Sequence, residues 1–421
     1  MLSEFFRKLR LIWSDPALRA RILFLIGAIA LFRFLAAIPI PGVNKLALDQ
    51  FFAGNQFLGL LNIFSGGGFS NLSLVMLGVG PYITASIIMQ LATVLSPKVK
   101  AMYTEDGEAG RTKFISIARM ITIPIAILQA VAFLSLLEGQ GILASLGGFG
   151  FAVNVFLAAA GSILLMWIGE LITEFGIGNG VSLIIFAGII ASVPAGVSQL
   201  LFTATAANIP AILGFAAAAL AITWAIVVVS EAERSIPIAY ARQVRGTTPS
   251  ATYLPIRLLQ AGVIPIIFAL SLLLLPQMAF TGLAAFGFGW VQGAAAWYQA
   301  FSLNIPAYAT VYFLLVVMFT YFYTSITFEP KRVADNLQKS GAFIPGVRPG
   351  RETEGYVGSV VNRITLPGAL FLGFIAVVPF IVQGITGITA LLIGGTALLI
   401  AVQVLIDLIR KIEAQISLRE Y

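Results

Sequence analysis

The sequence has no cysteine and no histidine among its 421 residues. These absences exclude disulfides, thiol nucleophiles and imidazole bases, together with most ligand sets for zinc, haem and iron–sulfur clusters. A phosphate-binding Gly-Lys-Ser/Thr loop is missing as well. We therefore expect no cofactor, no metal site and no ATP hydrolysis by the chain itself, and a redox or hydrolytic enzyme is disfavoured.

Charged residues are scarce, at 10% of the chain, whereas about a quarter of the residues of a soluble domain are charged. Hydrophobic residues make up 59% of the chain, and the mean hydropathy is +0.97. A soluble fold does not fit this balance, because lipid must be the main solvent. The composition predicts a polytopic membrane protein.

A membrane-spanning helix needs roughly 20 mostly apolar residues. The sequence predicts an all-α protein of about ten transmembrane helices, over residues 22–38, 72–95, 114–137, 151–172, 181–200, 209–230, 258–278, 308–328, 364–383 and 388–409. Five spans in each half mean that the second half enters the membrane from the opposite face. We therefore predict two halves of inverted topology, residues 1–200 and 201–421, with a site or pore between them.

The 25 Lys and Arg residues exceed the 18 Asp and Glu residues, which taken alone would fit nucleic-acid binding. When alternate loops are assigned to opposite sides of the membrane, 23 of these 25 residues fall on one side. Lys45 lies in an opposite loop, and Arg33 lies inside the first span, where it lines a water-filled cavity or snorkels to the surface. This asymmetry explains the positive charge and predicts cytoplasmic termini.

Several segments outside the spans have distinct compositions. Residues 1–15 are amphipathic and basic, which favours an interfacial helix over an unstructured basic tail. The two long cytoplasmic loops, about 231–257 and 329–363, contain Pro, Gly and both signs of charge, as ordered docking hairpins do. The uncharged segment 281–296 is expected to be an external loop.

The segment 57–69, FLGLLNIFSGGGF, is apolar but too short to cross a membrane. It is either an external amphipathic loop or a re-entrant helix, with a hinge at its three consecutive glycines. Isoleucines recur at helical spacing inside several spans, such as Ile83 and Ile87. They pack or face lipid, or they form a hydrophobic constriction that dewets.

Acidic residues are absent from the predicted midplane of every span. Ion-coupled transporters usually place ionisable groups there, so a secondary transporter is disfavoured.

Seven segments in order resemble the motifs of the SecY family of protein-translocation channels. They are GPYITASIIMQL (80–91), EAGRTKF (108–114), ITEFGIGNGVSLIIFAGI (172–189), AGVIPIIFA (261–269), FEPKRVADNLQKSGAFIPGVRPG (328–350), GGTALLI (394–400) and IEAQI (412–416). The resemblance extends over essentially the whole chain. It implies an hourglass channel in the bacterial cytoplasmic membrane, which passes unfolded secretory proteins across and membrane-protein segments sideways into lipid.

The resemblance also implies roles for individual residues. A pore ring would be formed by Ile83, Ile87, Ile185, Ile189, Ile267 and Ile400, with Ile264 adjacent. A plug at about 56–70 would close the external funnel with Leu58, Leu60, Leu61, Ile63, Phe64, Gly66, Gly67 and Gly68. The second and third spans, opposite the seventh and eighth, would form the lateral gate.

The implied partners are the SecE and SecG subunits, the SecA ATPase, the ribosome, signal sequences, nascent chains and membrane lipid. SecA or the ribosome would dock on Arg242, Arg245, Arg257 and Arg348, because exposed arginines bind phosphates and carboxylates in bidentate fashion. For Arg242 and Arg245, ordinary positive-inside charge remains an alternative. Arg257 stands where the family pattern leads us to expect a lysine.

Overall fold

The structure is a computed structural model, and it describes residues 14–44, 47–48, 68, 71–143, 147–202, 209–240, 252–262, 264–284, 289–386 and 390–417. The predicted interfacial helix at 1–15 lies outside this part of the chain except for its last two residues. The plug segment lies outside it except for Gly68.

Every predicted span corresponds to one helix of the structure, which confirms the helical membrane-protein fold class. These helices are α2 (Pro16–Ala37), α5 (Gly80–Leu95), α7 (Gly107–Gly139), α8 (Gly147–Phe175), α9 (Gly180–Phe202), α10 (Ile209–Glu231), α11 (Ile264–Ala284), α13 (Ile305–Thr327), α15 (Arg351–Thr386) and α16 (Ala390–Ser417). Three further helices are α6 (Pro97–Thr104), α12 (Gly289–Leu303) and α14 (Pro330–Lys339).

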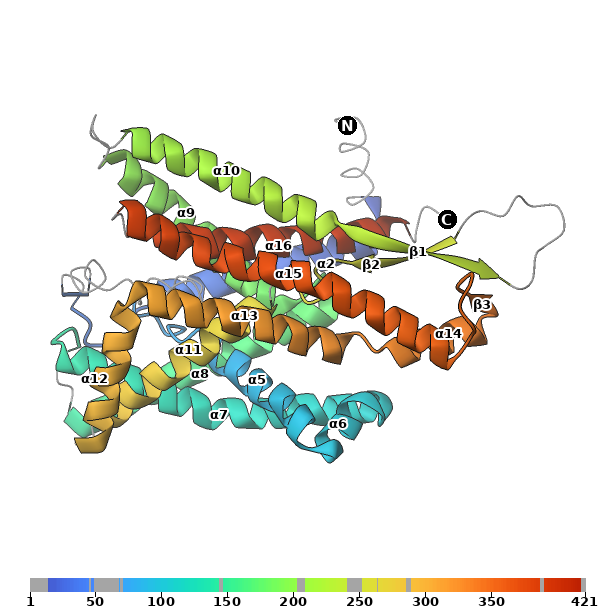
Figure 1. The fold of residues 1–421 in the computed structure, drawn as a ribbon. Coiled ribbons are helices and arrows are strands. Elements are labelled where there is room, and N and C mark those ends of the chain that lie inside the picture. The colour runs from blue at the N-terminus through green and yellow to red at the C-terminus, as the bar shows by residue number, and fades with distance from the viewer. Residues whose placement is uncertain are drawn as a thin grey trace.

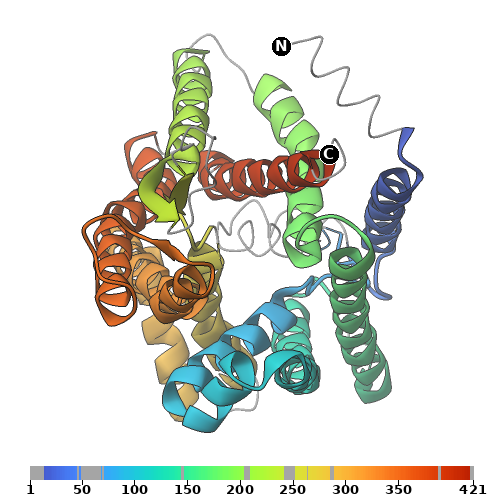
Figure 2. The same ribbon diagram turned by 90° about the vertical axis from the view of Figure 1, so that its right-hand side faces the viewer.

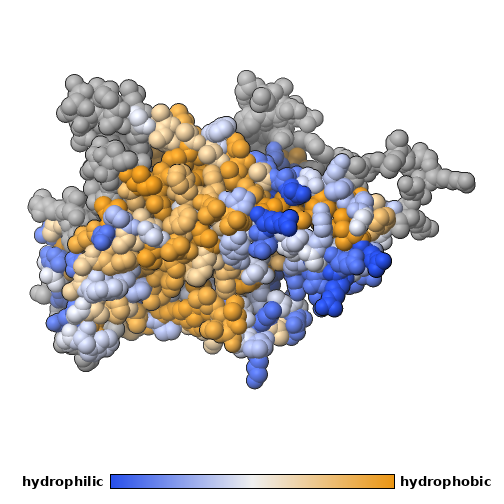
Figure 3. All heavy atoms as spheres, viewed as in Figure 1, coloured by the Kyte–Doolittle hydropathy of each residue, from blue (hydrophilic) through white to orange (hydrophobic). Residues whose placement is uncertain are grey.

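Within the described residues, five helices are long and apolar enough to cross a membrane: α2, α7, α8, α13 and α15. The α5–α6 pair, bent by 112°, would be a sixth if its two helices form one broken span, and α9, α10 and α11 hold shorter apolar stretches. Large apolar side chains such as Phe34, Phe156 and Phe374 are exposed, and Figure 3 shows an apolar band across the middle of the molecule. An apolar surface of this kind is stable in lipid and not in water.

The helices pack in two groups that follow the chain. Helices α2, α5, α7, α8 and α9 contact one another, and so do α10, α11, α13, α15 and α16. Between the groups, α11 packs against α5 and α7, and α16 packs against α9. Seen along the bundle, the second group lies on the left and top of Figure 2 and the first group on the right and bottom.

Two predicted spans begin later in the structure than the hydropathy indicates. Helix α5 begins at Gly80 because Gly78 adopts a left-handed φ of 60° and Pro81 favours a first helical turn. Helix α11 begins at Ile264, where Gly262 has a φ of 58° and Pro265 follows. In both cases apolar residues lie on both sides of the glycine, so hydropathy alone places the start of the helix too early.

The two long loops form one small sheet. Strands β1 (Glu233–Tyr240), β2 (Thr252–Arg257) and β3 (Ala342–Phe343) pair antiparallel in the order β2-β1-β3. Ile236, Ile256, Ile344 and Val357 are buried together beneath it. This sheet lies with α6 and α14 at the right of Figure 1, where Figure 3 shows strongly hydrophilic residues. We call it the basic end, because these elements carry Lys98, Lys100, Arg234, Arg257, Lys331 and Arg332.

The opposite end of the bundle, at the left of Figure 1, is called the neutral end. Helix α12 lies there and includes the second part of the segment 281–296, which was expected to be a loop, so that expectation was wrong. Its apolar and small side chains have no helical hydropathy signal strong enough to separate it from the spans on either side.

Residues 71–79 form successive turns that pack tightly against the middle of α8. A Cβ atom on Gly161 would lie 2.0 Å from the carbonyl oxygen of Leu74, and the neighbouring Ser162 hydroxyl donates a 2.8 Å hydrogen bond to Gly78 O. We expect Gly161→Ala to lower the thermal stability of the protein in detergent, because overpacking typically costs about 1–3 kcal/mol.

The matched control is Gly27→Ala in α2, where a Cβ atom would have no neighbour within 4 Å. This substitution is expected to be neutral or slightly stabilising, since alanine favours helix more than glycine does. Equal melting temperatures for Gly161→Ala and the unmodified protein would contradict the assigned close approach.

Candidate functional site

The isoleucines singled out in the sequence lie in one cluster, although they come from four helices. Helix α5 contributes Ile83 and Ile87, α9 contributes Ile185 and Ile189, α11 contributes Ile264 and Ile267, and α16 contributes Ile400. All are buried except Ile264, which is partly buried against the others. Both groups of helices supply members, so the cluster lies where the two halves meet. We call it the isoleucine collar.

Local sequence fixes the position of α9, which carries two collar residues. The Asn179 side chain accepts a hydrogen bond from Ser182 N at 3.2 Å and caps the start of the helix. A Cβ atom on Gly180 would lie 1.9 Å from Gly169 O, so only glycine permits this approach of α9 to α8. The Gly180 N–H also donates to the Thr173 hydroxyl at 2.9 Å.

A cavity of about 430 Å³ lies beside the collar. Ile83, Ile185, Ile264 and Ile267 line one part of it. The other lining side chains are the apolar Ile115, Val181 and Phe268 and the polar Tyr82, Ser86, Gln90, Arg119, Glu170, Thr173, Glu174, Asn179, Ser182 and Tyr323. The cavity therefore brings a set of polar side chains next to the collar.

A second cavity, of about 520 Å³, shares Asn179, Ser182, Ile264 and Tyr323 with the first. Its other polar lining comes from the basic end and includes Arg257, Gln403, Asp407, Arg410 and Lys411. The two cavities therefore lie side by side, with the second on the side of the basic end and the first beside the collar.

An ion pair between α7 and α8 borders the first cavity. Arg119 Nε lies 2.8 Å from Glu170 Oε1, and the glutamate side chain is only 18% exposed. Glu170 is one of the acidic residues near a span end in the sequence, but nothing in the sequence pairs it with Arg119. The pair connects two helices of the first half.

The helices expected at the lateral gate are α5 and α7 on one side and α11 and α13 on the other. Helix α11 contacts both α5 and α7. Phe268 of α11 packs edge-to-face on Phe319 and Tyr323 of α13, with ring centroids 6.0 and 6.2 Å apart. Helices α11 and α13 therefore form one packed pair, and the seam to the first half runs along α11.

Of the predicted docking arginines, Arg257 and Arg348 are exposed at the basic end. Arg257 is the last residue of β2, and Arg348 lies in the turn before α15. Arg242 and Arg245 lie outside the described residues. Of the plug residues only Gly68 is described, and its carbonyl accepts a hydrogen bond from Ser73 N at 2.9 Å.

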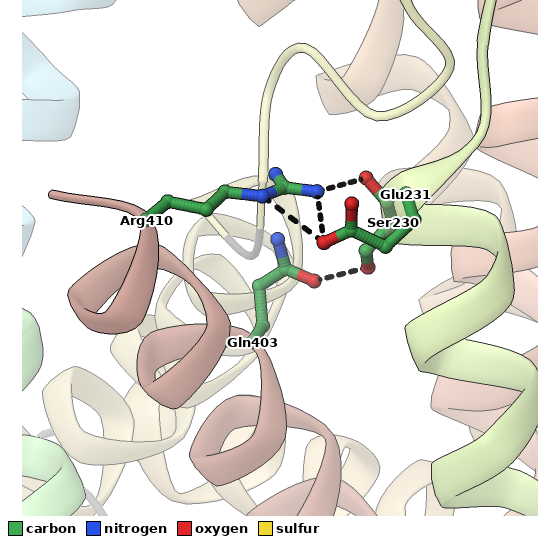
Figure 4. A network of polar contacts seen from close by, with 4 residues as sticks. All are labelled: Ser230, Glu231, Gln403 and Arg410. Atoms are coloured by element: carbon green, nitrogen blue, oxygen red, sulfur yellow. Dashed lines mark hydrogen bonds and ion pairs between the residues drawn. The ribbon is translucent and has the colours of Figure 1, made fainter. Parts of the chain in front are cut away.

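A polar network that the sequence did not indicate holds the base of the β1–β2 hairpin to α16 (Figure 4). Arg410 Nη2 donates to Glu231 Oε1 at 2.7 Å and to Ser230 O at 2.8 Å. The Ser230 hydroxyl donates to Gln403 Oε1 at 2.6 Å. Arginine suits this position, because Ser230 O belongs to the negative C-terminal end of α10.

We expect Arg410→Ala to release this junction and to speed amide hydrogen exchange in β1. The lost charge-assisted bonds contribute about 1–2 kcal/mol, because the arginine is mostly covered while Glu231 is exposed. Lys411→Ala, at the exposed neighbouring position, is the control and is expected to leave the exchange unchanged. Equal exchange rates in the two variants would contradict the role given to Arg410.

Comparison with known proteins agrees with this arrangement. The family model of SecY matches residues 73–409. The chain is 41% identical to the protein translocase subunit SecY of Mycobacterium bovis, covering 100% of this chain and 99% of the relative. It is also 41% identical to the SecY subunit of Helicobacter pylori, covering 97% and 98%.

Two solved structures share the fold. One is described as the structure of a protein conducting channel, with a TM-score of 0.68 and 19% identity. The other is Sec61 in the canine ribosome-channel complex from the endoplasmic reticulum, with a TM-score of 0.66 and 19% identity. Each comparison covers 94% of this chain and 92% of the solved chain. The sequence identities and the family model establish what the motifs indicated: this chain belongs to the SecY family.

Proposed function

We propose that this chain is a protein-conducting channel, which passes unfolded secretory proteins across the bacterial cytoplasmic membrane and releases apolar segments sideways into lipid. The observation that carries the proposal is the isoleucine collar, to which both halves contribute and beside which two neighbouring cavities lie. The chain acts as a passive pore and not as an enzyme.

An apolar collar suits this task for two physical reasons. A ring of isoleucines dewets when empty and so blocks ions. It also binds no passing side chain by a hydrogen bond or charge, so chains of any sequence slide through it. Polar side chains such as Tyr82, Ser86 and Gln90 line the first cavity beside the collar.

Sideways release requires the α11–α13 pair to separate from α5 and α7. A signal sequence is an apolar helix, and its transfer to lipid gains roughly 25 cal/mol per Å² of apolar surface. Lipid partition therefore supplies the driving force for exit, and the gate has only to open. Separation along α11 disrupts its contacts with α5 and α7 but leaves the aromatic packing between α11 and α13 intact.

The basic end is assigned to the cytoplasm by the positive-inside rule, which also places both termini there. Energy would come from the SecA ATPase or a translating ribosome docked on this end, and SecE and SecG would complete the membrane complex. Exposed Arg257 and Arg348 supply the bidentate contacts for docking. The relatives are named as subunits of a protein translocase, which supports an assembly with other subunits.

The test is protease protection of an unfolded secretory precursor in proteoliposomes that hold this chain with SecE, SecG, SecA and ATP. Protection that requires both this chain and ATP is the expected result. Its absence, with an active SecA ATPase and a folded channel complex, would overturn the proposal. Uptake of small solutes would then be measured, because a secondary transporter is the alternative membrane function.

A further inference from the structure

Helix α12 is the element of the fold that the channel function leaves unexplained. Figure 1 shows it at the neutral end, where it runs across the ends of α11 and α13 and not along them. It is the connection between these two helices, and it packs against both. A constraint on the position of α12 would therefore also constrain the α11–α13 pair.

The side chains of α12 separate into three faces. Val291 and Tyr298 are buried against the protein. Trp290 and Trp297, seven residues apart and hence on one face, are 72% and 69% exposed. Gln292 and Gln299 are exposed on another face, roughly 200° around the helix from the tryptophans at 3.6 residues per turn.

The tryptophan face does not resemble a water-facing surface. No charged side chain occurs in the sequence between Arg257 and Glu329, so the helix carries none. Exposed tryptophans without nearby charge are typical of the boundary between lipid and water, where the apolar ring and the polar N–H are both satisfied. Glutamines on the other side of the helix complete an amphipathic arrangement.

Aromatic contacts connect α12 to the gate helices. Tyr298 packs on Phe280 of α11 with ring centroids 6.4 Å apart, and its hydroxyl donates a hydrogen bond to the carbonyl of Leu273. Phe301 packs on Tyr308 of α13 at 5.9 Å. Burial raises the pKa of Tyr298 to about 12, so the hydroxyl keeps its proton at neutral pH and remains a donor.

We propose that α12 is an interfacial anchor whose tryptophan face lies in the lipid headgroup layer at the neutral end of the membrane. Lipid is the occupant that fits, because the tryptophan face is uncharged and α13, which follows α12 directly, exposes Val311, Leu314 and Met318 along its span. The anchor ties the α11–α13 pair to the bilayer. This consequence for gating rests on the proposed function, whereas the location of α12 does not.

The direct test uses tryptophan fluorescence of the full chain in lipid nanodiscs. Four of the five tryptophans are replaced by phenylalanine, which leaves only Trp297 or only Trp290. We expect lipids brominated near the headgroup to quench each of them strongly, and aqueous iodide to quench them weakly. A chain with only Trp167, which is exposed on the α8 span, is the control and should respond most to bromine placed deeper.

Two outcomes would overturn the proposal. Stronger quenching by iodide than by brominated lipid would place the tryptophan face in water, open to a soluble protein. Quenching by neither would mean that another protein subunit covers it. Neither quenching measurement depends on translocation activity. A failure of the anchor proposal can therefore be distinguished from a failure of the channel proposal.

A functional comparison then tests the link to the gate. The double variant Trp290→Gln and Trp297→Gln is expected to slow membrane insertion of an apolar segment several-fold, with secretory translocation less affected. The matched variant Gln292→Ala and Gln299→Ala is expected to leave both unchanged. If the tryptophan variant inserts segments at the normal rate, α12 does not act on the gate.

Discussion

Replacing Ile83 and Ile185 together with glycine is expected to raise the ion leak of the idle pore about a hundredfold. Burying an isoleucine gains roughly 1.5 kcal/mol or more, so two of them contribute about 3 kcal/mol to the cost of wetting the collar. A difference of 1.4 kcal/mol is a factor of ten in rate, which gives the expected magnitude. The measurement is single-channel conductance in planar bilayers without precursor.

Glycine also weakens a helix, so the collar variant needs a control with the same backbone change. Ile88 and Ile190 each lie five residues after a collar residue on the same helix, and both are exposed. The double variant Ile88→Gly and Ile190→Gly should fold as well as the collar variant, and its idle pore should still block ions. Equal conductance in the two variants would show that Ile83 and Ile185 are not part of the barrier to ions.

The helical membrane-protein fold class and the order of the apolar helices could be predicted from the sequence, because hydropathy indicates which segments lie in lipid. Assigning the isoleucines to a collar required information beyond hydropathy. The spacing of Ile83 and Ile87 indicates a shared helix face, but such a face packs against lipid just as well. Resemblance to the family identified the other members, and the structure brings side chains from α5, α9, α11 and α16 into one cluster.

Other features could not be predicted, since they depend on contacts between segments far apart in the sequence. The Arg119–Glu170 pair and the Arg410–Glu231 pair each join two helices, and single helices contain no signal for them. The sheet of β1, β2 and β3 joins two loops that are separated by α11, α12, α13 and α14. Helix α12 was missed because uncharged, small residues look alike in a loop and in an interfacial helix.

Arg348→Ala is expected to slow SecA-driven translocation about thirtyfold, while the idle pore stays closed. The reason is that this substitution would remove the proposed charge-assisted contact to the motor, and such a contact is worth about 2 kcal/mol or more at a protein interface. Arg348→Lys should restore only part of the rate, because an ammonium group cannot make the bidentate contact. The measurement is ATP-dependent protection of a precursor over time.

The backbone around Arg348 is held firmly enough to present the side chain in one place. Pro345 and Gly346, with a φ of 85° at the glycine, make a tight turn closed by the hydrogen bond from Val347 N to Ile344 O at 3.0 Å. The Thr353 hydroxyl donates to Arg348 O at 2.9 Å, and Ile344 is buried beneath the sheet. A side chain on such a support loses little entropy when it binds a partner.

Arg351→Ala is the matched control, since Arg351 is exposed one turn away at the start of α15 and carries the same charge. If both arginines contribute only positive-inside charge, they are equivalent. Arg348→Ala and Arg351→Ala would then have the same small effect on the rate of translocation. If Arg348 makes a docking contact, only Arg348→Ala will lower the rate of translocation. The ratio of the two rates therefore separates a specific contact with the motor from the general charge asymmetry that orients the chain in the membrane.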